Sequence, residues 1–339
     1  MKLLVTGGAG FIGSNFIRHM LSAYPDYRII NLDKLTYAGN LENLQDIDKF
    51  PNYTFVKGDI GDSHIFDKME IDAIVNFAAE SHVDRSILDA TPFLKTNVIG
   101  TYNLLETARQ KACIFLHVST DEVYGSIDRG FFNEDSRLLP NSPYAASKAA
   151  SDMLVRSYVE THDVMAIITR CSNNYGPYQF PEKLFPLVIL NALNRKPIPV
   201  YGDGMNVRDW IHVNDHCRAL DAVLHKGRAG DVYNIGARCE RTNIEAVRLL
   251  LKKTSEQLGI DEQELTGLIT FVKDRPGHDK RYAIDPSMIE GNLKWLPEKD
   301  FDKGVSETVQ WYLSNEKWWQ RIVSGEYAEY YRTQYGESI

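Results

Sequence analysis

The stretch Lys2-Leu-Leu-Val-Thr-Gly-Gly-Ala-Gly-Phe-Ile-Gly13 decides which fold we expect for this chain. It begins as a short apolar strand, Lys2 to Thr6, and it enters a helical pattern that runs from Phe11 to Leu21. Between them, Gly7, Gly10 and Gly13 are spaced as in a turn where the backbone approaches a pyrophosphate and the helix packs closely on the strand. Glycines in this strand, turn and helix context predict a dinucleotide-binding turn.

A second strand, Arg28 to Leu32, extends this prediction because it ends in Asp33. A carboxylate about twenty residues beyond the glycines can accept hydrogen bonds from an adenosine ribose and repel a 2′-phosphate. Asp33 therefore favours NAD over NADP. Lys34 lies next to it and can attract a phosphate, so the residues by themselves leave the choice of cofactor open.

Two further strands are expected to end at the same cleft. Tyr53 to Lys57 leads into Gly58-Asp59-Ile60, and Ala73 to Phe77 leads into Ala78-Ala79-Glu80-Ser81-His82. Small side chains at a strand end let a cofactor lie close to the backbone, and Asp59 is placed for the adenine edge; the alternative is ordinary loop chemistry. The residues expected to bind the cofactor are Gly7, Gly10, Phe11, Ile12, Gly13, Asp33, Lys34, Asp59, Ile60, Ala78, Ala79, Tyr144 and Lys148.

Two adjacent acids follow the expected buried strand Cys113 to Ser119. The chain continues as Thr120-Asp121-Glu122, so these side chains fall where a parallel strand ends and where ligands bind in open α/β sheets. Two neighbouring carboxyls hinder each other's ionisation, which raises one pKa and divides the pair into an acid and a base. The alternative interpretation is a solvated turn.

A tyrosine and a lysine share one face of the helix that should follow. Asn141-Ser142-Pro143 offers capping side chains and a proline suited to a first helical turn, and Tyr144 and Lys148 lie four residues apart. A lysine ammonium beside a phenol favours the phenolate and brings the phenol pKa toward neutral pH. The pair predicts a proton-transfer role, although the same spacing also occurs on ordinary exposed helix faces.

These motifs resemble the extended short-chain dehydrogenase/reductase (NAD-dependent epimerase/dehydratase) family, and within it the dTDP-glucose 4,6-dehydratases. The matching segments are TGGAGFIGSNF (6–16), LDKLTYAGNL (32–41), AAESHVDRSI (78–87), STDEVYG (119–125), PYAASKA (143–149), SNNYGPYQFPEKL (172–184) and RDWIHV (208–213). Thr120-Asp121-Glu122 is the discriminating run, because related epimerases carry small residues there and related decarboxylases keep the glutamate without the aspartate.

The resemblance implies an NAD-dependent carbon–oxygen lyase that converts dTDP-glucose to dTDP-4-keto-6-deoxyglucose and water, in deoxysugar biosynthesis such as that of rhamnose. NAD⁺ would take the C4 hydride, because a C4 ketone acidifies the C5 proton, and the hydride would return to C6. Tyr144 would remove the C4 hydroxyl proton, with Lys148 lowering its pKa and Thr120 orienting that hydroxyl. Glu122 would take the C5 proton, and protonated Asp121 would protonate the departing C6 hydroxyl.

The second half of the chain is expected to hold the sugar nucleotide. Arginine forks match phosphate oxygens, so Arg208 and Arg275 are candidates for the diphosphate. We also expect Tyr201-Gly-Asp-Gly204 to form a hairpin turn that closes over the base. The residues expected to bind substrate are Ser81, Thr120, Asn173, Lys183, Leu184, Arg208, Asn243, Arg275 and His278.

The order of expected strands and helices predicts an α/β fold, a Rossmann-type doubly wound parallel sheet with a smaller α/β substrate-binding lobe. We expect residues 1–172 to form the NAD-binding domain and residues 173–339 to form mainly the sugar-nucleotide domain. Residues 209–236, with a helix from Val213 to His225 and a strand from Asp231 to Ile235, are expected to return to the first domain. The last helical region is expected from Phe301 to Gln320.

Composition excludes several other classes of protein. The net charge of −8 disfavours nucleic acid as a partner, since phosphate-backbone binding needs clustered Lys and Arg. No apolar run is long enough to span a bilayer, and the N-terminus enters a strand directly, so we expect a cytoplasmic protein. The four cysteines show no paired spacing and the nine histidines no ligand cluster, so we expect reduced thiols and no metal.

The helices expected at Pro92 to Gln110 and Tyr144 to Thr161 carry apolar residues on more than one face. In the resembling family these helices pair across a dimer axis, which implies a homodimer. Two alternatives to the dTDP-glucose enzyme remain at this point. One is a dehydratase or epimerase of UDP-glucose or another nucleotide sugar, since no motif separates thymine from uracil. The other is an NAD-sensing regulator, which should have lost the tyrosine, lysine or acids that this chain retains.

Overall fold

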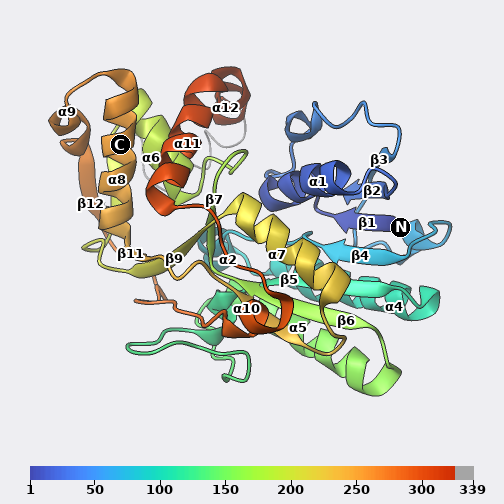
Figure 1. Ribbon diagram of the computed structural model, residues 1–339. Coiled ribbons are helices and arrows are strands. Elements are labelled where there is room, and N and C mark those ends of the chain that lie inside the picture. Colours follow the sequence, from blue (N-terminus) through green and yellow to red (C-terminus); the bar gives the residue numbers. More distant parts are fainter. Residues whose placement is uncertain (325–339) are drawn as a thin grey trace.

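The computed structural model describes residues 1–324, and its central element is a sheet of seven strands (Figure 1). Their order is β10-β6-β5-β4-β1-β2-β3, and every pairing is parallel. The predicted Rossmann-type sheet is therefore confirmed. The strands are β1 (Lys2–Thr6), β2 (Arg28–Asp33), β3 (Tyr53–Lys57), β4 (Ala73–Asn76), β5 (Ile114–Thr120), β6 (Ala166–Cys171) and β10 (Val232–Ile235).

Helices cover both faces of this sheet, and the side chains of β1 show why. Leu3 and Val5 point into one hydrophobic core, which contains residues of α1 (Phe11–Ala23) and α7 (Val213–Lys226). Leu4 points into the opposite core, with residues of α4 (Thr101–Lys111) and α5 (Pro143–His162). A strand buried on both faces needs a continuous apolar run, and Leu3-Leu4-Val5 supplies it.

A smaller lobe beside the sheet contains a three-stranded sheet, β11-β9-β7, and a two-stranded sheet, β12-β8 (Figure 1). Phe185, Val188 and Leu250 belong to its separate hydrophobic core. Its strands are β7 (Asn173–Tyr175), β8 (Ile198–Tyr201), β9 (Val207–His212), β11 (Glu240–Thr242) and β12 (Ile269–Val272). Its helices are α6 (Leu184–Leu193), α8 (Asn243–Leu258), α9 (Glu262–Thr266), α11 (Phe301–Ser314) and α12 (Glu316–Val323).

Short helical segments complete the described chain. They are η1 (Leu41–Leu44), η2 (Ser63–Phe66), α2 (Val83–Leu88), α3 (Thr91–Phe93), η3 (Leu94–Gly100), η4 (Asp121–Tyr124) and α10 (Ser287–Leu293).

Three local expectations differ from the structure. Tyr201-Gly-Asp-Gly204 is not a hairpin turn, because β8 pairs in parallel with β12 while β9 pairs with β7 and β11. The region Phe301 to Gln320 is two helices, since Asn315 leaves helical geometry between α11 and α12. The segment Pro92 to Gln110 is helical throughout, but its centre, η3, is a π-helix. Periodicity does not reveal which strand will pair with which, or where a helix widens.

Parts of the second half of the chain return to the large sheet. β10 forms its edge next to β6, and α7 packs against α1. Ile289, Leu293 and Trp295, in and after α10, also belong to the core shared with α1 and α7. The division at residue 172 stays an interpretation, and its part from residue 325 onward lies outside the described residues. Among the residues described, no helix has the length and apolarity needed to cross a membrane.

Close packing holds α1 against the turn that precedes it. A Cβ on Gly13 would lie 2.4 Å from the Gly7 carbonyl oxygen and 2.8 Å from the Gly8 Cα atom. Both neighbours are backbone atoms, which cannot move aside as a flexible side chain can. Position 13 therefore requires glycine for packing.

Gly13→Ala should lower the free energy of unfolding by about 1–3 kcal/mol, because the added methyl overpacks a backbone contact. Gly291→Ala is the matched control: Gly291 also lies inside a helix, α10, but its added Cβ would meet nothing within 4 Å. That change should raise stability by about 0.5–1 kcal/mol. Urea unfolding without added nucleotide measures both, and wild-type stability of Gly13→Ala would contradict the packing.

Candidate active site

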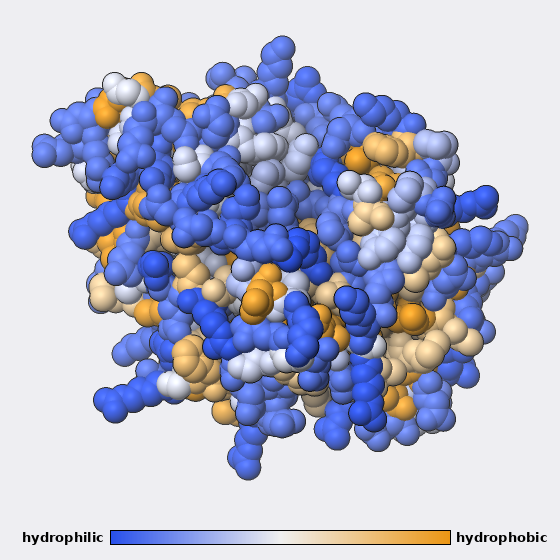
Figure 2. Space-filling view, in the orientation of Figure 1, coloured by the Kyte–Doolittle hydropathy of each residue, from blue (hydrophilic) through white to orange (hydrophobic). Residues whose placement is uncertain are grey.

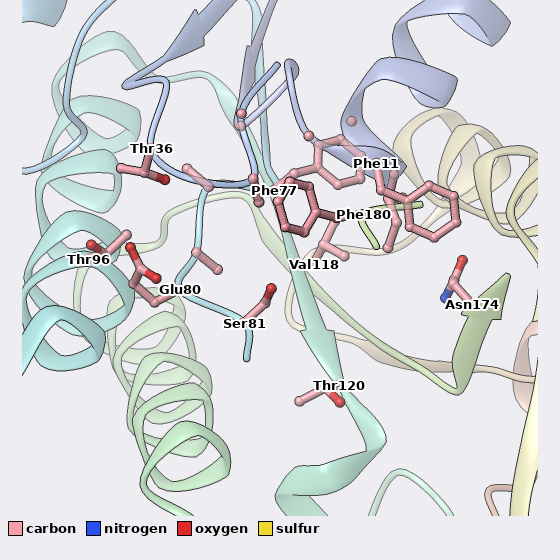
Figure 3. A pocket seen from close by; sticks show the side chains of 18 of the residues that line it. Phe11, Thr36, Phe77, Glu80, Ser81, Thr96, Val118, Thr120, Asn174 and Phe180 are labelled. Carbon is pink, nitrogen blue, oxygen red and sulfur yellow. The ribbon is translucent and has the colours of Figure 1, made fainter. Parts of the chain in front are cut away.

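A cavity of about 310 Å³ lies at the carboxyl ends of the parallel strands. Because all these strands run in one direction, the residues that follow β1, β2, β4 and β5 meet at one edge of the sheet. Figure 3 shows Phe11, Phe77 and Phe180 gathered at one side of the cavity and Thr120 at the end of β5. Every residue predicted to bind the cofactor lines it, as do Thr120, Asp121 and Glu122.

The glycine turn forms one wall of this cavity. Gly7 has a φ of +72°, and a Cβ there would lie 2.6 Å from the Ala78 backbone nitrogen. Gly10 is the N-cap of α1, and no side chain caps this helix end. Free backbone N–H groups at a helix N-terminus attract anions, so the turn fits the pyrophosphate of a dinucleotide.

Asp33 is held by the backbone at the end of β2. Its carboxylate accepts hydrogen bonds from the Ala9 nitrogen at 2.9 Å and the Leu35 nitrogen at 2.8 Å. Burial raises the pKa of Asp33, and these two bonds oppose the rise. Lys34, which left the choice of cofactor open, forms an ion pair with Asp59 at 2.7 Å. The lysine charge is therefore already balanced within the chain.

The two acids after β5 lie in a low-dielectric environment. Asp121 is only 3% exposed, and burial together with the neighbouring Glu122 raises its pKa well above the usual range. Burial also raises the pKa of Glu122, but the positive charges of Arg275 and Arg208 oppose that rise. Asp121 is thus the group that keeps its proton, and Glu122 is the group that arginines help to ionise.

Tyr144 and Lys148 lie in the first turns of α5, where Ser142 is the N-cap and accepts a hydrogen bond from the Ala145 nitrogen at 3.1 Å. Burial, followed by the charge of Glu122, raises the pKa of Tyr144 well above 10. The expected lowering of the Tyr144 pKa by Lys148 stays a prediction, because burial and the neighbouring carboxyls dominate the Tyr144 pKa in this structure. Burial also lowers the pKa of Lys148, to about 8.

The structure brings only part of the predicted substrate set to the cavity wall. Ser81, Thr120, Asn173 and Lys183 line it, and the Lys183 Nζ atom donates to the Ser81 carbonyl at 3.0 Å. The other five residues, Leu184, Arg208, Asn243, Arg275 and His278, lie outside that lining.

Two of these five are nevertheless close enough to act electrostatically on the acids. The charges of Arg208 and Arg275 lower the Glu122 pKa. Arg208 Nη2 donates to the Asp279 carbonyl at 2.9 Å, and Arg275 pairs with Asp84 at 3.0 Å. Asn243 begins α8, and His278 bonds to Asp274 at 2.6 Å.

Several lining residues were not singled out from the sequence. Thr36, Ala38 and Gly39 lie within the LDKLTYAGNL segment, and Asn174, Gln179, Phe180 and Glu182 lie within SNNYGPYQFPEKL. The motifs that contain them were the available signal. Thr96 had no such signal, since it comes from the π-helix η3 and lies beside Glu80 in Figure 3. Among residues 1–324, no group of three or more His, Cys, Asp or Glu side chains is placed to hold a metal ion.

Known proteins resemble this chain along nearly its whole length. A dTDP-glucose 4,6-dehydratase of Neisseria meningitidis serogroup B is 50% identical, with 96% of this chain and 97% of the relative covered. The crystal structure of DesIV, a dTDP-glucose 4,6-dehydratase of Streptomyces venezuelae with NAD bound, is 51% identical with a TM-score of 0.90, over 95% of this chain and 100% of that one. The Bacillus anthracis dTDP-glucose 4,6-dehydratase in complex with NAD is 51% identical with a TM-score of 0.86, over 95% and 99% of the two chains. The family model described as GDP-mannose 4,6 dehydratase matches residues 4–308, and the chain belongs to this family.

Proposed function

We propose that this protein is an NAD-dependent dTDP-glucose 4,6-dehydratase, which forms dTDP-4-keto-6-deoxyglucose and water. The observation that carries the proposal is the buried Asp121 beside the half-buried Glu122 at the end of β5, in the same cavity as Tyr144, Lys148 and the glycine turn. An acid that keeps its proton beside one that can lose it suits an elimination, which needs a proton donor and a proton acceptor. Relatives about half identical to the chain carry this activity in their names.

NAD fits the cofactor side of the cavity. The uncapped N-terminus of α1 would hold its pyrophosphate, and Asp33 would bind the adenosine ribose and repel a 2′-phosphate. When bound, NAD⁺ would supply the acceptor for the C4 hydride, and because that hydride would return to C6, no net reductant would be needed. The pairing of Lys34 with Asp59 supports NAD over NADP, because it leaves Asp33 as the dominant charge at the ribose.

The first step, oxidation at C4, would depend on a side chain of α5. Tyr144 would take the proton of the C4 hydroxyl, and Thr120 would orient that hydroxyl from the end of β5. Because burial raises the Tyr144 pKa, the phenol needs positive charge nearby to act as a base. Lys148, with its ammonium fully buried on the same helix face, would supply part of that charge.

The elimination of water would be carried out by the two acids that follow β5. Asp121 would give its proton to the departing C6 hydroxyl, and Glu122 would accept the C5 proton. Burial raises the pKa of both carboxyls, so each proton transfer would occur in a site of lower dielectric than water.

The diphosphate of the sugar nucleotide would be bound by Lys183, Arg208 and Arg275, whose positive charges already act on Glu122. Ser81 and Asn173 line the same wall and would contact the sugar. Leu184, Asn243 and His278, which lie outside the cavity lining, would contact the nucleoside. The proposed division at residue 172 follows this chemistry: residues 1–172 would bind the cofactor, and residues 173–339 would bind mainly the substrate.

A homodimer is also part of the proposal. Large apolar side chains are exposed on α2, η3, α4 and α5, namely Leu88, Leu94, Ile99, Tyr102 and Met153. Hydrophilic residues cover most of the face in Figure 2, and hydrophobic ones gather at its lower right, where Figure 1 places α4 and α5. Clustered apolar exposure marks interaction surfaces. A cytoplasmic location is proposed as well, and the free thiols of the four cysteines suit it.

Incubation with equimolar dTDP-glucose and UDP-glucose, without added reductant, should remove one water, about 18 Da, from the thymidine compound alone. Mass spectrometry of the nucleotide fraction measures it. Loss from the uridine compound would keep the reaction and change the substrate. No mass change in either would favour an epimerase, whose product has the same mass, or a sensing role.

Tyr144→Phe should abolish formation of reduced nicotinamide, whereas Asp121→Asn with Glu122→Gln should still allow it and slow water loss by about 10²–10⁴-fold. Single-turnover absorbance of the reduced cofactor, followed by mass spectrometry, separates the steps. Asp128→Asn, an exposed carboxylate in the loop after η4, is the control and should resemble wild type. Equal loss of cofactor reduction in both active-site variants would refute the division of roles.

The protein should sediment as a dimer at micromolar concentration. Replacing Leu94 and Met153 by glutamate should give a monomer, because the proposed surface would then have to bury charge. Leu296→Glu, at a side chain 58% exposed elsewhere, is the control and should remain dimeric. A wild-type monomer in analytical ultracentrifugation would overturn this part of the proposal.

A further inference from the structure

Lys148 is the one member of a buried polar network that lines the cavity. Behind it lie His117 of β5, Asp152 of α5, Arg170 of β6, Asn76 of β4 and Thr6 of β1, all at most 3% exposed and none in the cavity wall. We call this set the Lys148 network. Five polar residues concentrated behind one lysine require an explanation, since burying such groups opposes folding unless they are paired.

Hydrogen bonds determine how His117 is oriented. The Thr6 hydroxyl donates to Asn76 Oδ1 at 2.7 Å, which turns the Asn76 amide nitrogen toward His117 Nδ1, 3.3 Å away. That nitrogen can only donate, so His117 Nδ1 must accept. Burial, with the charges of Lys148 and Arg170, also lowers the pKa of His117 well below its usual value. The imidazole is therefore neutral, with its proton on Nε2.

The protonated His117 Nε2 lies between a cation and an anion. The Lys148 Nζ atom is 3.5 Å from it, and Asp152 Oδ1 is 3.7 Å from it. A protonated nitrogen cannot accept from an ammonium, so its N–H is directed at Asp152. Asp152 Oδ2 accepts from Arg170 at 2.9 Å, whereas Oδ1 has no hydrogen-bond partner in the described part of the chain. That oxygen therefore directs its charge toward His117 and Lys148.

We propose that Asp152 and His117 are positioning residues for Lys148: the Asp152 carboxylate keeps the buried lysine charged, and the His117 ring holds the two apart at a fixed separation. The inference rests on the proposed function, because a charged lysine matters only if Tyr144 must lose a proton. The remaining anchor of Lys148 is a hydrogen bond from Nζ to the Val118 carbonyl at 2.8 Å.

The groups that act on Lys148 come from three elements. Burial lowers its pKa to about 8, and the charge of Asp152, on its own helix, opposes this most strongly, followed by Cys171 of β6. From β5, neutral His117 contributes no charge. From β6, Arg170 pairs with Asp152 Oδ2, which leaves the Oδ1 side of the carboxylate facing His117. Tyr144 is protonated at neutral pH in this structure. Asp152 is thus the main stabiliser of the ammonium.

Lys148 acts as an ammonium, so activity is lost as pH rises through its pKa. Removing the Asp152 charge lowers that pKa, and the alkaline limb of the kcat profile should move to lower pH by about one to three pH units. Asp152→Asn tests this, and Asp152→Glu, which restores the charge, should return the limb toward wild type.

Tyr124→Phe is the matched control. The Tyr124 hydroxyl accepts from Arg170 at 2.8 Å and donates to Asn234 at 2.9 Å, so it belongs to the surroundings of Arg170 but not to those of Lys148. It should reduce stability without moving the alkaline limb. If Asp152→Asn leaves the limb in place, or if Tyr124→Phe moves it equally, Asp152 has only a structural role.

Titration followed by ¹⁵N NMR tests the roles of Asp152 and His117 without relying on enzyme activity. In wild-type protein, His117 should remain the neutral Nε2–H tautomer across neutral pH. The Lys148 ammonium signal, which is assigned by its loss in Lys148→Arg, should titrate at lower pH in Asp152→Asn than in wild type. An Nδ1–H tautomer, or equal lysine titration in both proteins, would overturn the proposal even if Asp152→Asn fails to fold well enough for kinetics. The two proposals can fail separately. If the His117 tautomer and the Lys148 titration are as expected but the protein has no dehydratase activity, the proposed function is refuted and the effect of Asp152 on Lys148 stands.

Discussion

Parallel strand pairing is the constraint on which the rest of this structure depends. Because all seven strands run in one direction, the residues after β1, β2, β4 and β5 meet at one edge of the sheet. The glycine turn, Asp33, the small Ala78 and Ala79, and the acids after Thr120 come from separate parts of the chain. A single sheet register places them around one cavity.

The same packing makes the site costly to fold. Helices on both faces bury the sheet, so ionisable groups at its edge lose hydration. Burial raises the pKa values of Asp121, Glu122 and Tyr144 and lowers that of Lys148. Each shift opposes the charged form, and the protein retains these groups because proton transfer needs pKa values that differ from those in water.

Hydrogen bonds and an ion pair also join the two halves of the chain. Asp84 of α2 pairs with Arg275 at 3.0 Å and accepts from the Tyr201 hydroxyl at 3.1 Å, and both partners come from the second half of the chain. On another side, Trp318 of α12 donates to Asn43 of η1 at 2.8 Å. These bonds join the first half of the chain to the second, so Arg275, one of the arginines that influence Glu122, is held by a residue of the opposite half.

The parallel sheet, its glycine turn, the end of β5 and the capped start of α5 could all be predicted from the sequence, because each depends on local periodicity and on side chains near one another in the chain. The motifs also predicted residues that the structure brings to one cavity, among them the glycine turn, Asp33, Tyr144 and Lys148. The folded structure was needed to show that β8 and β9 lie in different sheets and that Arg208 and Arg275 act from outside the cavity wall. It was also needed to show that burial raises the Tyr144 pKa. It also assembled the Lys148 network, whose members come from β1, β4, β5, α5 and β6. Strand partners, burial and electrostatic coupling are set by residues distant in the chain, and no local pattern of residues encodes them.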